Sequence, residues 1–233
     1  MNTPTALPIY LRISELLARE IAAGHLLDGE RLAPERELSA RFGVSVGTLR
    51  KSLAELTRQG LLERRQGSGN YVQARADARN LYAFFRIELL AGAGLPTAQL
   101  LSLDHLEKPA DLPAFGSSAV AHRIRRLRFL NDIPCVLEEI WLDGSYARQI
   151  APQDLSESLY LYYRQRLNMW ISHVEDSVSV RPVPDWRPPG FAPAPGVPLG
   201  YFERIGFDQD NRRAEFSRNW FDPALARYVA RIR

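Results

Sequence analysis

Hydrophobic residues in the first quarter of the chain recur at helical spacing in three successive segments. The first segment lies between Pro8 and Gly24, with an apolar stripe made by Ile9, Ile13, Leu16, Leu17 and Ile21. A short helix is predicted for residues 34–42, where Leu38 and Phe42 are four residues apart. After a break at Gly43, a third helix is predicted from the N-cap Ser45 to the stop at Gly60, with a stripe of Leu49, Leu53 and Leu56. Two short helices joined by a tight glycine-containing turn predict a helix-turn-helix.

The pattern then changes from helical to extended. Residues 61–65 and 70–73 flank the sequence Gln-Gly-Ser-Gly, which predicts a two-stranded hairpin with basic residues. Gly67 and Gly69 have no Cβ, so the backbone at this tip can approach a phosphate or the floor of a groove. Residues 1–73 are therefore predicted to form a winged helix-turn-helix domain.

The rest of the chain is dominated by strand patterns. Residues 74–80 lack apolar periodicity and are interpreted as a linker. Helices are predicted for residues 109–115 and 155–167. Strands are predicted for residues 81–87, 100–106, 119–130, 133–142, 170–180, 199–207 and 214–221. Residues 81–233 are thus predicted to be one mostly antiparallel domain, and the fold class is α+β.

Composition and charge narrow the classes of function. The chain has 233 residues, of which 45% are hydrophobic and 24% are charged, as in a globular protein. Residues 1–75 hold eleven basic against eight acidic residues, whereas the remainder holds nineteen of each. This distribution suggests an anionic partner for the first domain alone, but an excess of three charges is too small for sequence-indifferent DNA packaging. No apolar window reaches the length of a membrane span and the start lacks a signal peptide, so a cytoplasmic protein with no membrane partner is expected.

Metal, cofactor and catalytic signatures are missing from the sequence. The single cysteine, Cys135, excludes an internal disulfide and a cysteine-rich zinc site, and it is interpreted as a small core residue. The four histidines show no spacing typical of metal ligands. No nucleophile signature, nucleotide loop or dinucleotide fingerprint occurs. We therefore expect no metal, no cofactor and no catalytic residues.

Four motifs of the first domain occur in order. They are Glu-Arg-Leu-Ala-Pro-Glu-Arg-Glu-Leu-Ser at residues 30–39, Gly-Val-Ser-Val-Gly-Thr-Leu-Arg at 43–50, Gly-Leu-Leu at 60–62 and Arg-Gln-Gly-Ser-Gly at 65–69. Together they resemble the DNA-binding domain of GntR-family bacterial transcription regulators over residues 8–73. The resemblance implies double-stranded operator DNA as the partner and assigns roles to particular residues. Arg36 and Arg50 would be DNA-contacting arginines, Ser45 and Thr48 would bind phosphates or base edges, and Gly67 would enter the minor groove. The alternative for the arginines is a solvated helix face.

Two features depart from the family pattern. Val46 stands where the family usually has Arg, and Gly47 stands where it usually has Thr. Valine cannot hydrogen-bond a base edge, so the operator preference of relatives should not be transferred to this chain. Pro34 replaces the usual serine cap of the second helix, but proline suits a first helical turn and the helix is expected to form.

The second domain resembles the UTRA sensor domain, which defines the HutC subfamily and shares its fold with chorismate lyase. The matching motifs are Arg-Leu-Arg at residues 126–128, Asn-Asp-Ile-Pro at 131–134, Glu138, Ser-Leu-Tyr at 158–160 and Ala-Glu-Phe-Ser at 214–217. The resemblance spans residues 82–233. It departs at residues 182–198, where seven prolines occupy a region that is a helix in many relatives and helps to enclose their effector. The shape of the pocket is therefore not carried over.

Effector-binding residues follow from this resemblance. Arg126 and Arg128 lie on one face of a strand, and two adjacent guanidinium groups suit a carboxylate or phosphate. Glu138 on the partner strand is expected either to hold the arginines or to accept a hydrogen bond from the ligand, and Ser158, Tyr160 and Glu215 would add further hydrogen bonds. The alternative is an exposed sheet face of paired charges. Arg123 and Arg125 should point to the opposite face into solvent.

Taken together, the two domains predict a metabolite-responsive transcriptional regulator with a small, anionic effector. It is expected to repress a catabolic or transport operon and to bind a palindrome as a homodimer held by the second domain. The alternative is an enzyme of lyase-like fold with an accessory DNA-binding domain. The direction of the ligand's effect on DNA binding stays open.

Overall fold

The computed structural model describes residues 7–22, 25–73, 84–92, 94–155 and 157–230. The chain divides into two compact units, one from Leu7 to Arg86, joined by the C-terminal residues from Val229, and one from Ile87 to Tyr228. The linker predicted for residues 74–80 lies outside the described residues. Each unit is described by itself.

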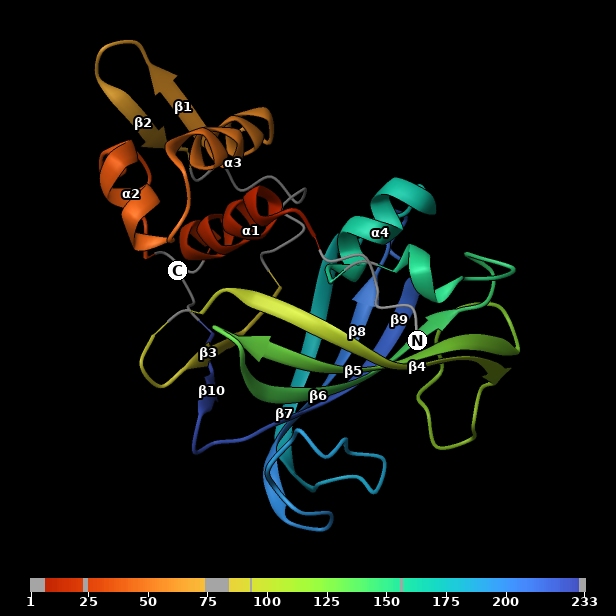
Figure 1. The fold of residues 1–233 in the computed structure, drawn as a ribbon. Coiled ribbons are helices and arrows are strands. Elements are labelled where there is room, and N and C mark those ends of the chain that lie inside the picture. Colours follow the sequence, from red (N-terminus) through yellow and green to blue (C-terminus); the bar gives the residue numbers. More distant parts are fainter. Residues whose placement is uncertain (1–6, 23–24, 74–83, 93, 156, 231–233) are drawn as a thin grey trace. The chain divides into compact units, whose positions relative to one another are not determined.

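The first unit contains the predicted helices and hairpin. Its elements are α1 (Ile9–Ala22), α2 (Glu35–Arg41), α3 (Val46–Arg58), β1 (Leu62–Arg65) and β2 (Gly69–Val72) (Figure 1). The predicted leucine stripe of α3 is buried, as are Ile13 and Leu17 of α1. Ile9 is 38% exposed, contrary to its predicted place in the stripe, because it is the first residue of α1 and lies beyond the packed face. The N-cap Pro34 is extended and α2 begins directly after it, as expected.

A six-stranded antiparallel sheet forms the body of the second unit, with the strand order β4-β5-β6-β9-β8-β7. The strands are β4 (Pro96–Glu107), β5 (Val120–Leu130), β6 (Ile133–Asp143), β7 (His173–Pro182), β8 (Pro198–Phe207) and β9 (Arg213–Phe221). A separate pair joins β3 (Ile87–Leu89) to β10 (Ala226–Tyr228). One 3-10 turn (Pro152–Asp154) precedes helix α4 (Leu159–Arg166). The α+β prediction is confirmed.

Three predicted elements differ from the structure. Residues 109–115 form turns and no helix, because Pro113 supplies no backbone N–H inside the predicted helix and only one turn-type bond forms, from Leu112 to Pro109. The strand predicted for 81–87 is displaced to β3; residues 84–86 are not a strand, and 81–83 lie outside the described residues. Helix α4 is shorter than predicted and starts only after Ser158, whose backbone is extended. The strand β10 had no counterpart in the prediction.

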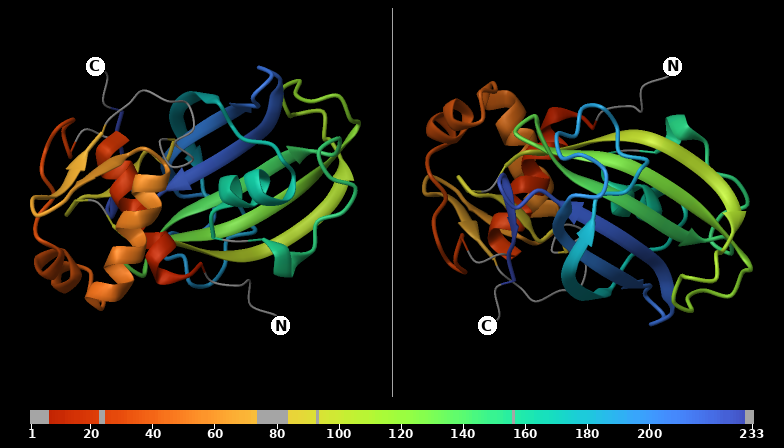
Figure 2. Two further views of the ribbon diagram at one scale, coloured as in Figure 1. Left: turned by 90° about the horizontal axis from the view of Figure 1, so that it is seen from above. Right: turned by 90° about the horizontal axis from the view of Figure 1, so that it is seen from below.

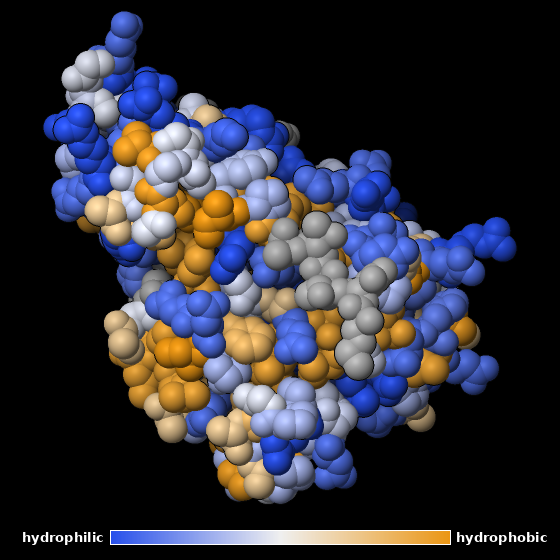
Figure 3. Space-filling view, in the orientation of Figure 1, coloured by the Kyte–Doolittle hydropathy of each residue, from blue (hydrophilic) through white to orange (hydrophobic). Residues whose placement is uncertain are grey.

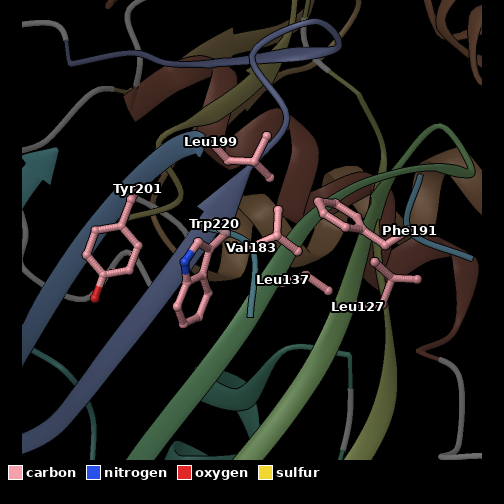
Figure 4. Close-up of a cluster of buried hydrophobic side chains, with 7 residues drawn as sticks. All are labelled: Leu127, Leu137, Val183, Phe191, Leu199, Tyr201 and Trp220. Atoms are coloured by element: carbon pink, nitrogen blue, oxygen red, sulfur yellow. The ribbon is translucent and has the colours of Figure 1, made fainter. Parts of the chain in front are cut away.

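The two faces of the large sheet are covered differently. Figure 2 shows the sheet from above with α4 in front of it, and from below with the segment between β7 and β8 in front. This proline-rich segment adds side chains to a buried apolar cluster made by Leu127, Leu137, Val183, Phe191, Leu199, Tyr201 and Trp220 (Figure 4). Leu127 and Leu137 alternate along β5 and β6 with Arg126 and Glu138. The segment therefore covers the face opposite these charged residues.

Cys135 is fully buried, and burial raises the pKa of its thiol to about 12, in agreement with the predicted core role. Among the described helices, none has the length and apolar character needed to cross a membrane.

Candidate functional site

The groove between α2, α3 and the wing collects basic side chains. Its volume is about 770 Å³, and Arg36, Arg50 and Gly67 line it, so the structure brings three predicted DNA-binding residues together. Arg31, Arg64 and Arg65 line the same groove. Figure 3 shows the wing tip as a strongly hydrophilic region. Five guanidinium groups around one groove form a surface suited to a polyanion.

Ordinary folding rules position the groove residues. Arg36 lies in the first turn of α2, directly after the proline cap, and Arg50 lies in the second turn of α3. Gly67 has a φ of 73°, a conformation that a residue with a side chain rarely adopts. A Cβ at Gly69 would lie 3.2 Å from Nε of Arg31, so glycine lets this arginine lie against the wing.

Ser45 and Thr48 interact with each other rather than with the arginines of the groove. The Ser45 hydroxyl accepts a hydrogen bond from the Thr48 backbone N–H at 3.1 Å and lies 2.9 Å from the Thr48 hydroxyl. Ser45 is therefore the N-cap of α3, as expected from the sequence. Both residues lie at the start of the helix that presents Arg50, but neither lines the arginine groove.

Two groove arginines are already held by neighbours. Nε of Arg50 donates to the Glu35 carboxylate at 2.7 Å. Arg65 binds Glu63 and lies over the ring of Tyr71, 4.3 Å from its centroid. Exposed pairs of this kind contribute about 0–1 kcal/mol, so a phosphate or guanine can replace the carboxylate at little cost. The sequence interpretation missed Arg31, Arg64 and Arg65 as groove residues. The available signal was their place in the motifs: Arg31 lies in the motif of residues 30–39, Arg65 begins the wing motif and Arg64 directly precedes it.

A second candidate site lies on the α4 face of the large sheet, around Glu138. The Glu138 carboxylate receives NH2 of Arg126 at 2.6 Å and Nε of Arg128 at 2.9 Å. All three residues are at most 7% exposed, so the alternative of an exposed sheet face is wrong. Of the two roles expected for Glu138, holding the arginines is the one that the structure contains.

The charges of this trio depend on each other. Burial raises the pKa of Glu138, but the two guanidinium groups lower it more strongly, to about 2. Burial lowers the pKa of Arg126, and Glu138 opposes that shift. Two cations and one anion leave the trio with one net positive charge. Nε of Arg126 is buried and has no hydrogen-bond partner among the described residues.

The other predicted effector residues lie beside this trio. Tyr160 and Tyr163 donate to the two oxygens of Glu215, at 3.2 Å and 2.6 Å. Burial raises the pKa of Glu215 even though both hydroxyl groups lower it. Ser158 is buried at the start of α4, and the carbonyl of its neighbour Glu157 accepts from Arg126 at 3.1 Å. Helix α4 therefore brings Ser158 and Tyr160 to the arginine face, and it adds Tyr163, which the sequence interpretation did not name.

A buried ion pair, also missed from the sequence, extends the polar cluster. Arg204 on β8 binds Asp176 on β7 through two contacts of 2.7 Å each. Tyr228 on β10 donates to the same carboxylate at 2.7 Å. A hydrogen bond to Arg204 lowers the pKa of the Tyr160 hydroxyl, although burial raises it overall. The sequence signal that could have identified Arg204 was the alternation of side chains between the two faces of β8.

Arg123 and Arg125 point to the opposite face, as predicted, but they are not freely solvated. Their side chains are only 23% and 22% exposed. Arg123 pairs with Asp104 at 3.0 Å, and Arg125 pairs with Glu139 at 2.7 Å. The expectation of solvated side chains is wrong because carboxylates on the adjacent strands hold both guanidinium groups, which also lie over the rings of Trp141 and Trp186.

Comparisons with known proteins agree with both halves of the structure. Residues 9–72 match the family model "Bacterial regulatory proteins, gntR family", and residues 93–225 match the model "UTRA domain". The chain is 56% identical over 232 residues to the HTH-type transcriptional regulator SmoD of Agrobacterium fabrum, covering 100% of this chain and 99% of that protein. It is 30% identical over 182 residues to the mannosyl-D-glycerate transport/metabolism system repressor MngR of Escherichia coli, covering 73% of each.

More distant similarities support the same assignment. The histidine utilization repressor of Pseudomonas aeruginosa is 27% identical over 168 residues, which cover 68% of this chain and 66% of that protein. The solved structure of the possible transcriptional regulator YydK from Bacillus subtilis has a TM-score of 0.53 at 20% identity, covering 97% of this chain and 100% of that chain, which supports the fold. The chain belongs to the GntR family of bacterial transcription regulators, in the HutC-type group that carries a UTRA domain.

Proposed function

We propose that this regulator is a metabolite-responsive repressor whose winged helix binds a palindromic operator as part of a homodimer. The arginine groove carries this proposal, because it combines two helix arginines with wing arginines around one cavity. Arg36 and Arg50 would contact bases or phosphates, and Gly67 would approach the minor groove. Ser45 and Thr48 would place their hydroxyl groups near the backbone. One small domain makes few contacts, so useful specificity needs two copies, with the UTRA domain joining them.

We also propose that the buried trio of Arg126, Arg128 and Glu138 binds an anionic effector. The trio has a net charge of +1, and the open Nε donor of Arg126 is a natural partner for one carboxylate or phosphate. Ser158, Tyr160 and Glu215 would bind the remaining polar groups. Two relatives are named for mannosyl-D-glycerate and histidine, compounds that both carry a carboxylate, which supports this class of effector. The alternative of a lyase-like enzyme has less support, because both buried carboxylates of the site already have partners.

The effect of the ligand would reach the DNA-binding domain through the second buried ion pair. Tyr160 connects the effector site to Arg204, Arg204 to Asp176, and Asp176 to Tyr228. Tyr228 ends β10, which pairs with β3, and β3 is the first strand after the DNA-binding unit. A change at the effector site would therefore shift the strand pair with which the second unit begins.

Two experiments test these proposals separately. Fluorescence anisotropy at fixed salt, with DNA fragments from around the regulator's own gene, should find one fragment bound tightly by wild type. Arg50→Ala should weaken that binding, whereas Arg41→Ala, outside the groove, should not. A thermal-shift screen of phosphorylated sugars and organic acids should give a compound that stabilises wild type and not Arg128→Ala. A responsive ligand without charge would contradict the effector assignment, and equal binding of all fragments would contradict operator recognition.

A further inference from the structure

A second pocket opens on the sheet face opposite α4, away from the Glu138 trio. Its volume is about 590 Å³, within the size range of small-molecule sites. Three arginines and three tryptophans line it: Arg123, Arg125, Arg218, Trp141, Trp186 and Trp220. The register places Arg125, Glu139 and Arg218 in one row across β5, β6 and β9. The proline-rich segment supplies Trp186.

Hydrogen-bond donors outnumber acceptors in this pocket. Two carboxylates line it, the exposed Glu107 and the buried Glu139. The oxygens of Glu139 already accept from Arg125 at 2.8 Å and from the Trp141 indole at 3.1 Å. The acids that pair with the other two arginines, Asp104 and Asp111, are 34% and 64% exposed at their side chains. Such exposed pairs are weak, so an incoming anion can replace them.

The indole N–H of Trp220 is a further unused donor. Trp220 is 7% exposed, and its Nε1 has no hydrogen-bond partner among the described residues. A buried donor without an acceptor is costly, and a bound acceptor would remove that cost.

Flat surfaces define the shape of the pocket wall. The Arg125 guanidinium lies 4.8 Å from the Trp186 ring centroid, and Trp186 meets Trp220 edge-on at 5.8 Å and 81°. Stacked planar groups of this kind favour a flat ring over a saturated one. We propose that this pocket is a second ligand site, which binds a small organic anion with an aromatic ring: the anionic group binds Arg125 and Arg218, and the ring packs against Trp186.

Calorimetry and ligand-observed NMR on the full-length chain test this site with phenyl phosphate and benzoate. The comparators are cyclohexanecarboxylate, which lacks the flat ring, and inorganic phosphate, which lacks any ring. At least one aromatic anion should bind about tenfold more tightly than both comparators. Whichever of phenyl phosphate and benzoate binds more tightly shows whether the site prefers phosphate or carboxylate.

Matched variants assign the binding to the pocket. Trp186→Leu and Arg218→Gln should each weaken it about tenfold, whereas Trp170→Leu and Arg212→Gln should not. If Trp186→Leu fails to fold, Trp186→Phe should fold and retain binding, because it keeps an aromatic wall. If binding is lost in Arg128→Ala but retained in the Trp186 variant, the ligand binds on the other face of the sheet, and the proposal is overturned. Failure of both aromatic anions to bind at millimolar concentration would also overturn it.

Discussion

Arg128 and Glu138 lie diagonally across the adjacent strands β5 and β6, with Nε and NH2 of the arginine 2.9 Å and 3.4 Å from the two carboxylate oxygens. The same carboxylate receives Arg126, so one buried acid holds two buried cations together. Such an arrangement positions the arginines before any ligand arrives. It also leaves them dependent on a single negative charge.

Replacing Glu138 with Gln should destabilise the fold. The change keeps the shape of the side chain but leaves two buried guanidinium groups without a counter-charge, which costs about 3–5 kcal/mol when a buried pair is broken. Urea unfolding followed by circular dichroism measures this loss. Glu107→Gln, at an exposed position on β4, is the control and should be nearly neutral. Added phosphate should stabilise the Glu138 variant more than wild type, and the absence of both effects would contradict the role of Glu138 as counter-ion.

Glu138→Gln should also change how strongly the stability of the fold depends on pH in the acid range. Glu138 has a pKa of about 2 in the folded chain and an ordinary value of 4.5, so between these values the unfolded chain binds more protons. The contribution of Glu138 to the free energy of unfolding is therefore complete above about pH 5 and is lost as the pH falls toward 2. Melting temperatures measured across this range should fall less steeply for Glu138→Gln than for wild type. Identical slopes in the two proteins would rule this interpretation out.

Glu215 should act in the opposite direction, because burial raises its pKa. The folded chain then holds this proton more tightly than the unfolded chain, so the contribution of Glu215 is present at low pH and is lost as the pH rises through its folded pKa. Glu215→Gln should therefore make the acid-induced loss of stability steeper than in wild type. The same series of melting temperatures across pH measures this slope. A shallower slope than in wild type would contradict the raised pKa of Glu215.

Local patterns were enough to predict the winged helix and most of the large sheet. The helix stripes of α1 and α3, the Gly-rich wing and the Asn131-Asp132 turn each depend on residues close in sequence. The contacts that define the candidate sites depend on strand order, which those patterns do not contain. Arg204 and Asp176 are 28 residues apart and meet only because β7 pairs with β8. The same limit applies to Tyr163, which reaches Glu215 from a helix 52 residues away.

The wing should contribute to DNA affinity without contributing to sequence choice. Arg64 is exposed on β1 and lines the groove. If it contacts a phosphate, Arg64→Ala should weaken binding to all sequences about equally and reduce the salt dependence by about one unit. Arg36→Ala should instead weaken the free energy of binding to the operator by about 1–3 kcal/mol and change binding to random DNA little. Anisotropy titrations at several salt concentrations distinguish the two, with Arg41→Ala as the control.

Removing one hydroxyl group should separate ligand binding from its effect on DNA. Tyr228→Phe deletes the donor to Asp176 but leaves the ring packed against Phe202, 5.3 Å between centroids. If Tyr228 transmits occupancy to β3, the variant should bind operator and the screened ligand nearly as wild type does, while the change in operator affinity on adding ligand shrinks about fivefold or more. Tyr201→Phe is the matched control, because its hydroxyl donates to Glu203 on the other face. Amide hydrogen exchange of residues 87–89 gives a second readout, since ligand should alter it in wild type and not in Tyr228→Phe. Full ligand response in the variant would show that the signal reaches the linker by another route.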